Sequence, residues 1–171
     1  QVMKKNGAKA IVQIHHGGAQ ALPELTPDGD VVAPSAISLK SFGQQKEHDA
    51  REMTAEEIEQ TIRDFGEATR RAIEAGFDGV EIHGANHYLI HQFVSPYYNR
   101  RNDVWADNYK FPVAVIDEVV KAKKAHANDD FIIGYRLSPE EAESPGISME
   151  ITEELIHQIA NKPLDYIHVS L

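Results

Sequence analysis

The stretch Gly79-Val-Glu-Ile-His-Gly-Ala-Asn-His-Tyr-Leu-Ile-His91 decides the fold of this chain. Its apolar start, Val80 to Ile82, predicts a short buried strand, and at His83 the apolar run breaks into polar residues. A helical pattern begins a few residues later. Strands that end in polar side chains and turn directly into a helix are typical of βα enzymes, which keep their chemistry at that end of the strand. We therefore place the candidate functional residues here, in the polar cluster of His83, Asn86, His87 and Tyr88.

The rest of the chain repeats this alternation of strand and helix. Helix 54–76 is the clearest, because Thr54 and Glu57 form a capping box and Gly76 ends the pattern. Residues 2–6 resemble the end of an earlier helix, and Thr152 is the predicted N-cap of the last one. The predicted strands are 8–14, 80–82, 131–137 and 164–171, and the other predicted helices are 89–94, 111–127 and 152–160.

Regular βα alternation indicates either a doubly wound sheet or a (β/α) barrel. Polar residues end each predicted strand, and contributions from several strands favour the barrel; they are Gln13, His16, His83, Arg136 and Ser170. The glycine-rich phosphate motifs of doubly wound folds are absent from the sequence. A closed (β/α)8 TIM barrel needs about 250 residues. We therefore expect one α/β domain, residues 1–171, that forms about four βα units (strands 3 to 6) of a barrel with both ends missing.

Residues 19–51 carry many prolines and glycines and little periodicity. A segment this long in a compact domain is usually functional. Because it follows the carboxyl end of a strand, we expect a lid or wall of the site. Val31 to Ala33 predicts a short strand, as one half of a hairpin.

Composition restricts the class of protein. The formal net charge of -10 argues against binding to nucleic acid or to anionic membranes. The chain has no cysteine, which excludes disulfides and thiolate chemistry and is compatible with a cytoplasmic location. No apolar run approaches the roughly 18 residues expected of a membrane span.

Four motifs, in order along essentially the whole chain, resemble the old yellow enzyme family of FMN-dependent oxidoreductases, also called NADH:flavin oxidoreductases or ene-reductases. The two central motifs are specific in combination, whereas the first and last are weak alone. The motifs are Gln13-Ile-His-His-Gly-Gly18, Glu81-Ile-His-Gly-Ala-Asn-His-Tyr-Leu89, Phe93-Val-Ser-Pro96 with Asn99-x-Arg101-x-Asp103, and Tyr135-Arg-Leu-Ser138.

The resemblance implies an enzyme that passes hydride from NADH or NADPH, through FMN, to an activated alkene or another small electrophile. His83 and Asn86 would bind the carbonyl or nitro oxygen of the substrate, and Tyr88 would donate the proton. Gln13 would meet the pyrimidine edge of the flavin, and Arg136 would lie near its N1 and O2.

The chain also departs from the family pattern. His87 stands where the family usually has glycine, so its ring either crowds the site or turns outward. Residues 105–108 replace the Tyr-Gly-Gly loop of the family. The parts that would carry the FMN phosphate site and the first flavin-flanking loop are missing, so FMN binding by these 171 residues alone is expected to be poor.

Other interpretations remain open. His83 and His16 could serve as acid and base in a flavin-independent barrel lyase or isomerase. A non-catalytic fragment could associate with another chain, or with its own copy, through two open sheet edges. In simpler structural roles, His83 is satisfied by the backbone, Asn86 is a helix cap and Tyr88 packs in the core.

A metal site is a further alternative, because His87 and His91 are four apart on a helix and His83 and His16 could lie near them. No acidic ligand cluster is predicted at the strand ends, so we expect no catalytic metal. Arg136 lies in an apolar strand and needs a partner, which a flavin or a carboxylate would supply. Arg100 and Arg101 are expected to hold a structural loop.

Overall fold

The computed structural model describes residues 2–41 and 43–171. A four-stranded parallel sheet forms its centre, with the order β1-β5-β6-β7. The strands are β1 (Ile11–Ile14), β5 (Gly79–Gly84), β6 (Ile132–Leu137) and β7 (Tyr166–Val169), and the helices are α1 (Ala55–Glu74), α2 (Leu89–Val94), α3 (Lys110–His126) and α4 (Met149–Ile159). The predicted alternation of strand and helix is confirmed.

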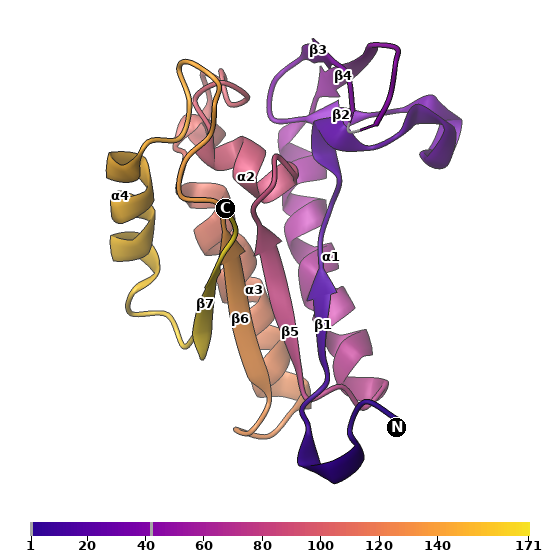
Figure 1. The fold of residues 1–171 in the computed structure, drawn as a ribbon, viewed down its shortest axis with the longest axis vertical. Coiled ribbons are helices and arrows are strands. Elements are labelled where there is room, and N and C mark those ends of the chain that lie inside the picture. Colours follow the sequence, from indigo (N-terminus) through magenta and orange to yellow (C-terminus); the bar gives the residue numbers. More distant parts are fainter. Residues whose placement is uncertain (1, 42) are drawn as a thin grey trace.

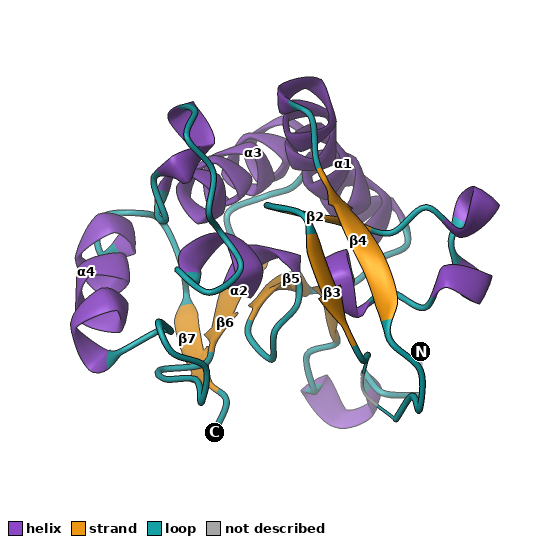
Figure 2. Cartoon of the chain, turned by 90° about the horizontal axis from the view of Figure 1, so that it is seen from above, coloured by secondary structure: helices purple, strands orange, loops and turns teal. Residues whose placement is uncertain are grey.

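Helices α1 and α3 cover one face of the sheet, and the opposite face is open (Figures 1 and 2). Alternate residues of a strand point to opposite faces, so each strand contributes half of its side chains to the core beneath the helices. From β5 these are Val80 and Ile82, and from β6 they are Ile133 and Tyr135, all fully buried. They join one hydrophobic cluster with residues of both helices, including Phe65 and Val119.

Both ends of α1 lie close to the positions that the sequence predicts. Thr54 Oγ1 accepts a hydrogen bond from the Glu57 N–H (3.2 Å), and Glu57 Oε2 accepts one from the Thr54 N–H (2.8 Å), which confirms the predicted capping box. At the other end, Lys4 Nζ donates to Gly76 O (3.1 Å). A lysine at this carbonyl complements the negative C-terminal end of α1. The predicted helix end at 2–6 is wrong, and a 3₁₀ turn, Lys5–Gly7, stands there.

The start of α4 also differs from the prediction. The helix begins at Met149 with Ser148 at the N-cap position, and Thr152 lies inside its first turn. Thr152 is buried and its hydroxyl donates to Pro139 O (2.6 Å). The threonine ties the helix to the preceding loop, which local sequence alone could not distinguish from a cap.

The segment 19–51 forms a second, three-stranded sheet of order β2-β4-β3. Its strands are β2 (Val32–Ala33), β3 (Ile37–Leu39) and β4 (His48–Glu52). The predicted short strand is confirmed, but its hairpin is wrong: β2 pairs with β4 in parallel, and the antiparallel pair is β3 with β4. This small sheet lies at the carboxyl end of the main strands (Figure 1). Phe42 lies outside the described residues.

Arg101 links the small sheet β2-β4-β3 to the loop that follows α2. Its side chain is only 5% exposed, and its Nη1 donates to Pro34 O (2.8 Å) and Met53 O (2.7 Å) while the rest of the guanidinium pairs with Asp103. Arg100 donates to Ala36 O (2.7 Å). The structural role predicted for this arginine pair is therefore confirmed.

The end of β1 is joined to α2 by close packing at Gly18. This residue has φ +56, and an added Cβ would lie 2.3 Å from Gln92 Oε1. That oxygen accepts a hydrogen bond from the Ala19 N–H (3.0 Å), and the Leu89 N–H donates to His16 O (3.0 Å). The first and second motifs are thus held together at one edge of the sheet. Among the described residues, no helix is long and apolar enough to cross a membrane.

Candidate active site

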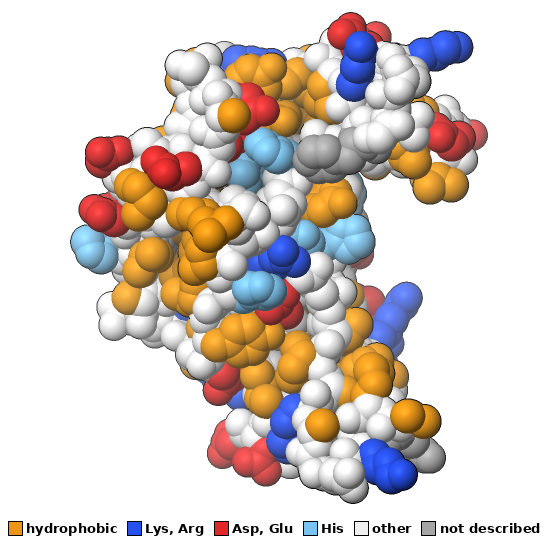
Figure 3. All heavy atoms as spheres, viewed as in Figure 1, with side chains coloured by type: hydrophobic (Ala, Val, Ile, Leu, Met, Phe, Trp, Pro, Cys, Tyr) orange, Lys and Arg blue, Asp and Glu red, His pale blue; other side chains and the backbone are white. Residues whose placement is uncertain are grey.

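The register of the sheet arranges polar side chains in layers on its open face. Gln13 pairs with Glu81, which pairs with Gly134, and Gly134 pairs with Tyr166. A Cβ on Gly134 would lie 2.1 Å from the Tyr166 ring, so glycine leaves the space that this ring fills. One layer closer to the carboxyl end, His83 pairs with Arg136 and Arg136 with His168. Figure 3 shows histidine, basic and acidic side chains gathered in the middle of this face.

Glu81 is the centre of the deeper layer and is 8% exposed. Its carboxylate accepts hydrogen bonds from Gln13 Nε2 (2.6 Å) and from the Tyr166 hydroxyl (2.9 Å), and it lies 3.0 Å from His168 Nδ1. Burial alone would raise the pKa of Glu81, but these hydrogen bonds outweigh burial and the pKa is lowered. The residue was missed as a site residue, although a charge between Val80 and Ile82 was a usable signal.

His83 is 5% exposed at the end of β5. Its Nδ1 accepts a hydrogen bond from the Ala85 N–H (3.3 Å), so the proton of the neutral ring is assigned to Nε2. Burial, helped by the positive charge of Arg136 and by His15, lowers the pKa of His83 to about 4. At neutral pH the side chain is therefore an uncharged N–H donor. Because Nδ1 already accepts a hydrogen bond from the backbone, the ring can still donate from Nε2 to a ligand.

Asn86 follows in the left-handed region, with φ 57. Its backbone N–H donates to Ser138 Oγ (3.1 Å), and its Oδ1 accepts from the Ser170 hydroxyl (3.0 Å). Ser170 in turn accepts from Arg136 Nη2 (2.7 Å). With Oδ1 engaged in this way, the two N–H groups of the amide are directed elsewhere and can donate to a ligand.

Tyr88, not Asn86, occupies the N-cap position of α2, and its side chain makes no capping hydrogen bond. The helix-cap interpretation of Asn86 is therefore wrong. The Tyr88 ring meets His83 edge to face at 5.0 Å and lies 5.3 Å from the His15 ring. The turn thus places a phenol, an imidazole N–H donor and an amide on one short stretch of chain.

The adjacent histidines of the first motif make different contacts, although both line the cavity beside α1. The His15 ring lies 6.1 Å from that of His83. His16 accepts a hydrogen bond from the Gly18 N–H (2.9 Å) and lines a cavity with Asp64 and other residues of α1. The residue that joins the catalytic candidates is therefore His15, which sequence reasoning missed. An acid–base pair of His83 and His16 finds no support in this geometry.

Two predicted cofactor residues flank this site. Gln13 is exposed on β1, and its Nε2 donates a hydrogen bond to Glu81 Oε1. Arg136 forms no ion pair among the described residues, and its Nε is buried without a hydrogen-bond partner there. A buried guanidinium donor without a partner is costly, and a polar heterocycle edge would satisfy it. The donor set therefore fits the carbonyl and ring-nitrogen edge of a flavin.

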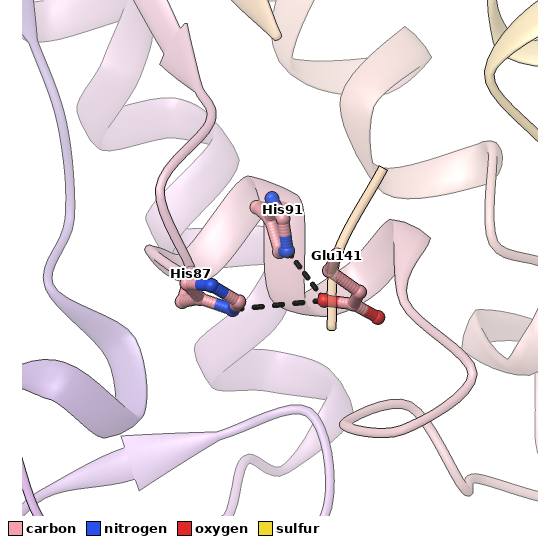
Figure 4. Close-up of side chains that lie close together, drawn as sticks. All are labelled: His87, His91 and Glu141. Carbon is pink, nitrogen blue, oxygen red and sulfur yellow. Dashed lines mark hydrogen bonds and ion pairs between the residues drawn. The ribbon is translucent and has the colours of Figure 1, made fainter. Parts of the chain in front are cut away.

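His87 turns away from the catalytic candidates. It has φ 58, and its ring lies 4.6 Å from His91 and 6.1 Å from Tyr98. Figure 4 shows both histidines directed at Glu141, from the loop between β6 and α4. His87 and His91 do come together, but His87 precedes α2 and the group contains Glu141 in place of the predicted His83 and His16. Glu141 was missed because no local pattern marks it in that loop. The ring does not crowd the site.

Comparisons with known proteins agree with this geometry. The NADH:flavin oxidoreductase / NADH oxidase family matches residues 1–171. The chain is 53% identical over 175 residues to the probable NADH-dependent flavin oxidoreductase YqiG of Bacillus subtilis (strain 168), covering 100% of this chain and 46% of that protein. It is 48% identical to the NADH:fumarate oxidoreductase of Klebsiella pneumoniae (strain 342), covering 100% of this chain and 19% of that protein. The chain thus spans less than half the length of these relatives.

Solved structures share the fold. The histamine dehydrogenase of Rhizobium sp. 4-9 superposes with a TM-score of 0.84 and 26% identity, over 98% of this chain and 24% of that one. Morphinone reductase in complex with tetrahydroNAD gives a TM-score of 0.78 and 27% identity, over 95% of this chain and 49% of that one. The predicted partial TIM barrel is therefore confirmed.

Proposed function

We propose, because this chain belongs to the NADH:flavin oxidoreductase / NADH oxidase family, that it forms the substrate-binding half of an FMN-dependent ene-reductase. The observation that carries the proposal is the turn after β5. There, a neutral His83 N–H, the oriented Asn86 amide and the Tyr88 phenol stand together beside Arg136. NADH or NADPH is the reductant.

The side chains fit the charge changes of alkene reduction. When hydride arrives at the carbon far from an activating carbonyl or nitro group, negative charge develops on the oxygen of that group. His83 Nε2–H and the Asn86 amide N–H groups stabilise this oxygen, because donors fixed in advance in a buried site need no reorganisation. Tyr88 gives its phenolic proton to the carbon next to the activating group, which completes the addition of H⁻ and H⁺.

The chain also supplies groups for the cofactor. Gln13 and Arg136 would hold the polar edge of the ring system of FMN, which would supply the hydride when bound. The positive charge of Arg136 favours electron density at that edge. Glu81 orients the Gln13 amide by accepting a 2.6 Å hydrogen bond from its Nε2, so the amide oxygen Oε1 remains available to a ligand N–H.

Small conjugated electrophiles are the proposed substrates. Relatives carry the names NADH:fumarate oxidoreductase and NADH:acrylate oxidoreductase, which makes unsaturated carboxylates worth testing beside enones and nitroalkenes. The absence of cysteine is compatible with a cytoplasmic place of action, which belongs to the proposal. Strands β1 and β7 are edges of the main sheet, and we propose that further barrel strands or a second copy pair with them.

Absorbance spectroscopy tests the proposal. The full chain that contains these residues should purify with the visible absorbance of flavin, and NADH or NADPH should bleach it under anaerobic conditions. Adding an enone should then restore the colour. A colourless protein that cannot be reconstituted with FMN would overturn the assignment, as would a flavoprotein whose reduced form is not reoxidised by any activated alkene.

A further inference from the structure

His87, His91 and Glu141 bring three metal-binding groups to one point. Their ligand atoms all lie within 4.8 Å of one another. Glu141 Oε2 lies 2.7 Å from His91 Nε2 and 3.6 Å from His87 Nδ1. The two histidines come from the turn and first helical residues after β5, and the glutamate comes from the loop after β6 (Figure 4).

Burial and hydrogen bonds orient two of the three groups, His91 and Glu141, and the His87 side chain is 24% exposed. The Glu141 side chain is 0% exposed and His91 is 1% exposed. Glu141 Oε1 accepts hydrogen bonds from the Ser95 hydroxyl and from the Ile147 N–H (2.8 Å), which leaves Oε2 facing the two rings. Outer hydrogen bonds of this kind orient the ligands of metal sites.

The local charge indicates that a cation is needed. Glu143 adds a second carboxylate, whose Oε2 is buried without a hydrogen-bond partner and lies 4.0 Å from His87 Nδ1. Within residues 2–41 and 43–171, neither Glu141 nor Glu143 forms an ion pair with lysine or arginine. Buried carboxylates are normally paired with a positive charge or coordinated to a metal.

We propose that His87, His91 and Glu141 bind a divalent transition-metal ion of the zinc class, with Glu143 or water as fourth ligand. Zinc–nitrogen and zinc–oxygen bonds of about 2.0–2.2 Å place tetrahedral ligand atoms roughly 3.3–3.6 Å apart. The separation of 3.6 Å from His87 to Glu141 already fits, and the 2.7 Å contact of His91 must open by less than 1 Å.

The role of this site is structural. It joins the start of α2 to the loop between β6 and α4, and Ser138 at the start of that loop accepts the Asn86 N–H. A bound ion therefore fixes the loop next to the oxyanion donors without touching them. The site also accounts for a histidine with φ 58, a conformation that glycine adopts with less strain.

The left-handed backbone conformation of His87 makes glycine an informative substitution at this position. His87→Gly removes one ligand and suits the left-handed conformation, so it should fold at least as well as the parent without metal. Ser95→Ala removes a hydrogen bond that orients Glu141. His157→Ala is the matched control, because His157 is exposed and faces Glu154 at 4.0 Å on α4, outside the cluster.

The test is to titrate the metal-stripped full chain with Zn²⁺ and with Co²⁺. Calorimetry measures binding, thermal unfolding measures the change in stability, and the visible spectrum of Co²⁺ reports its coordination. We expect one equivalent to bind, raise the unfolding temperature and give the intense bands of four-coordinate Co²⁺. Ser95→Ala should weaken binding about 10–100-fold, His87→Gly and His91→Ala should lose saturable binding, and His157→Ala should behave as the parent. Absence of stoichiometric binding by the parent, or equal binding by His87→Gly, would overturn the proposal.

Discussion

The Ser170 hydroxyl lies 3.0 Å from Asn86 Oδ1 and donates a hydrogen bond to it. The same hydroxyl accepts from Arg136, so a residue just after β7 sets the orientation of an amide just after β5. Reversal of that amide would present an acceptor to the substrate oxygen in place of a donor. The relationship makes Ser170 a positioning residue.

Ser170→Ala should therefore lower kcat/KM for alkene reduction. Loss of one neutral hydrogen bond that orients the amide corresponds to about 1 kcal/mol, or roughly a 5–10-fold decrease. Steady-state kinetics with an enone measures it, with Ser38→Ala on the exposed side of β3 as the control. A Ser170→Ala enzyme with unchanged kcat/KM would show that the amide is oriented by other contacts.

Tyr88→Phe should separate the two half-reactions. Removal of the phenolic proton donor is expected to slow alkene reduction by roughly 10²–10⁴-fold, whereas reduction of the flavin by NADH or NADPH continues. Anaerobic stopped-flow spectroscopy follows each half-reaction through the flavin absorbance. Equal slowing of both would assign Tyr88 a structural role, through its ring contacts with His83 and His15.

Glu81→Gln should destabilise the fold. The carboxylate accepts partly buried hydrogen bonds from Gln13 and Tyr166, and an amide in its place leaves one of these donors without its acceptor, at a cost of about 1 kcal/mol. Because the pKa of Glu81 is lowered on folding, its contribution is complete above the ordinary value of 4.5 and is lost as pH falls below it. Urea unfolding at pH 7 and at pH 3.5 measures both effects, with exposed Glu59→Gln as control.

His83 should stay uncharged through the physiological range. Its pKa of about 4 in the folded protein, against 6.5 in the unfolded chain, means that the unfolded state takes up the proton first. The contribution of His83 to stability is therefore complete above pH 6.5 and decreases as pH falls from 6.5 towards 4. Titration by NMR of the ring resonances should show no inflection for His83 between pH 5.5 and 8, and an inflection near 6.5 would contradict the buried, neutral state.

Much of the fold was predictable because the strands and helices carry strong local signals. The capping box at Thr54 and the apolar runs at Val80 and Ile133 identify three elements by short-range physics alone. The start of α4 was misplaced, because Thr152 bonds to a distant carbonyl, and β4 was missed, because residues 48–52 are mostly polar and gain their pairing only from β2 and β3.

The site was predictable where motif and strand end coincide, at His83, Asn86 and Tyr88. Their roles remain predictions until they are tested. The contributions of Ser170 and Glu141 depend on contacts across 84 and 50 residues of sequence, respectively, so only the folded chain reveals them. His15 and His16 are adjacent, and the register of β1 with β5 decides which one approaches His83.

The most direct test of the account is the affinity of the oxidised, FMN-loaded full chain for a phenol, titrated through changes in flavin absorbance. His83 and Asn86 each donate to the phenolate oxygen in this account, and hydrogen bonds to a charged group contribute about 1.5–3 kcal/mol. We expect His83→Ala and Asn86→Ala each to weaken phenol binding by roughly 10–100-fold. Unchanged affinity in both variants would contradict the assignment of these two residues as the oxyanion donors.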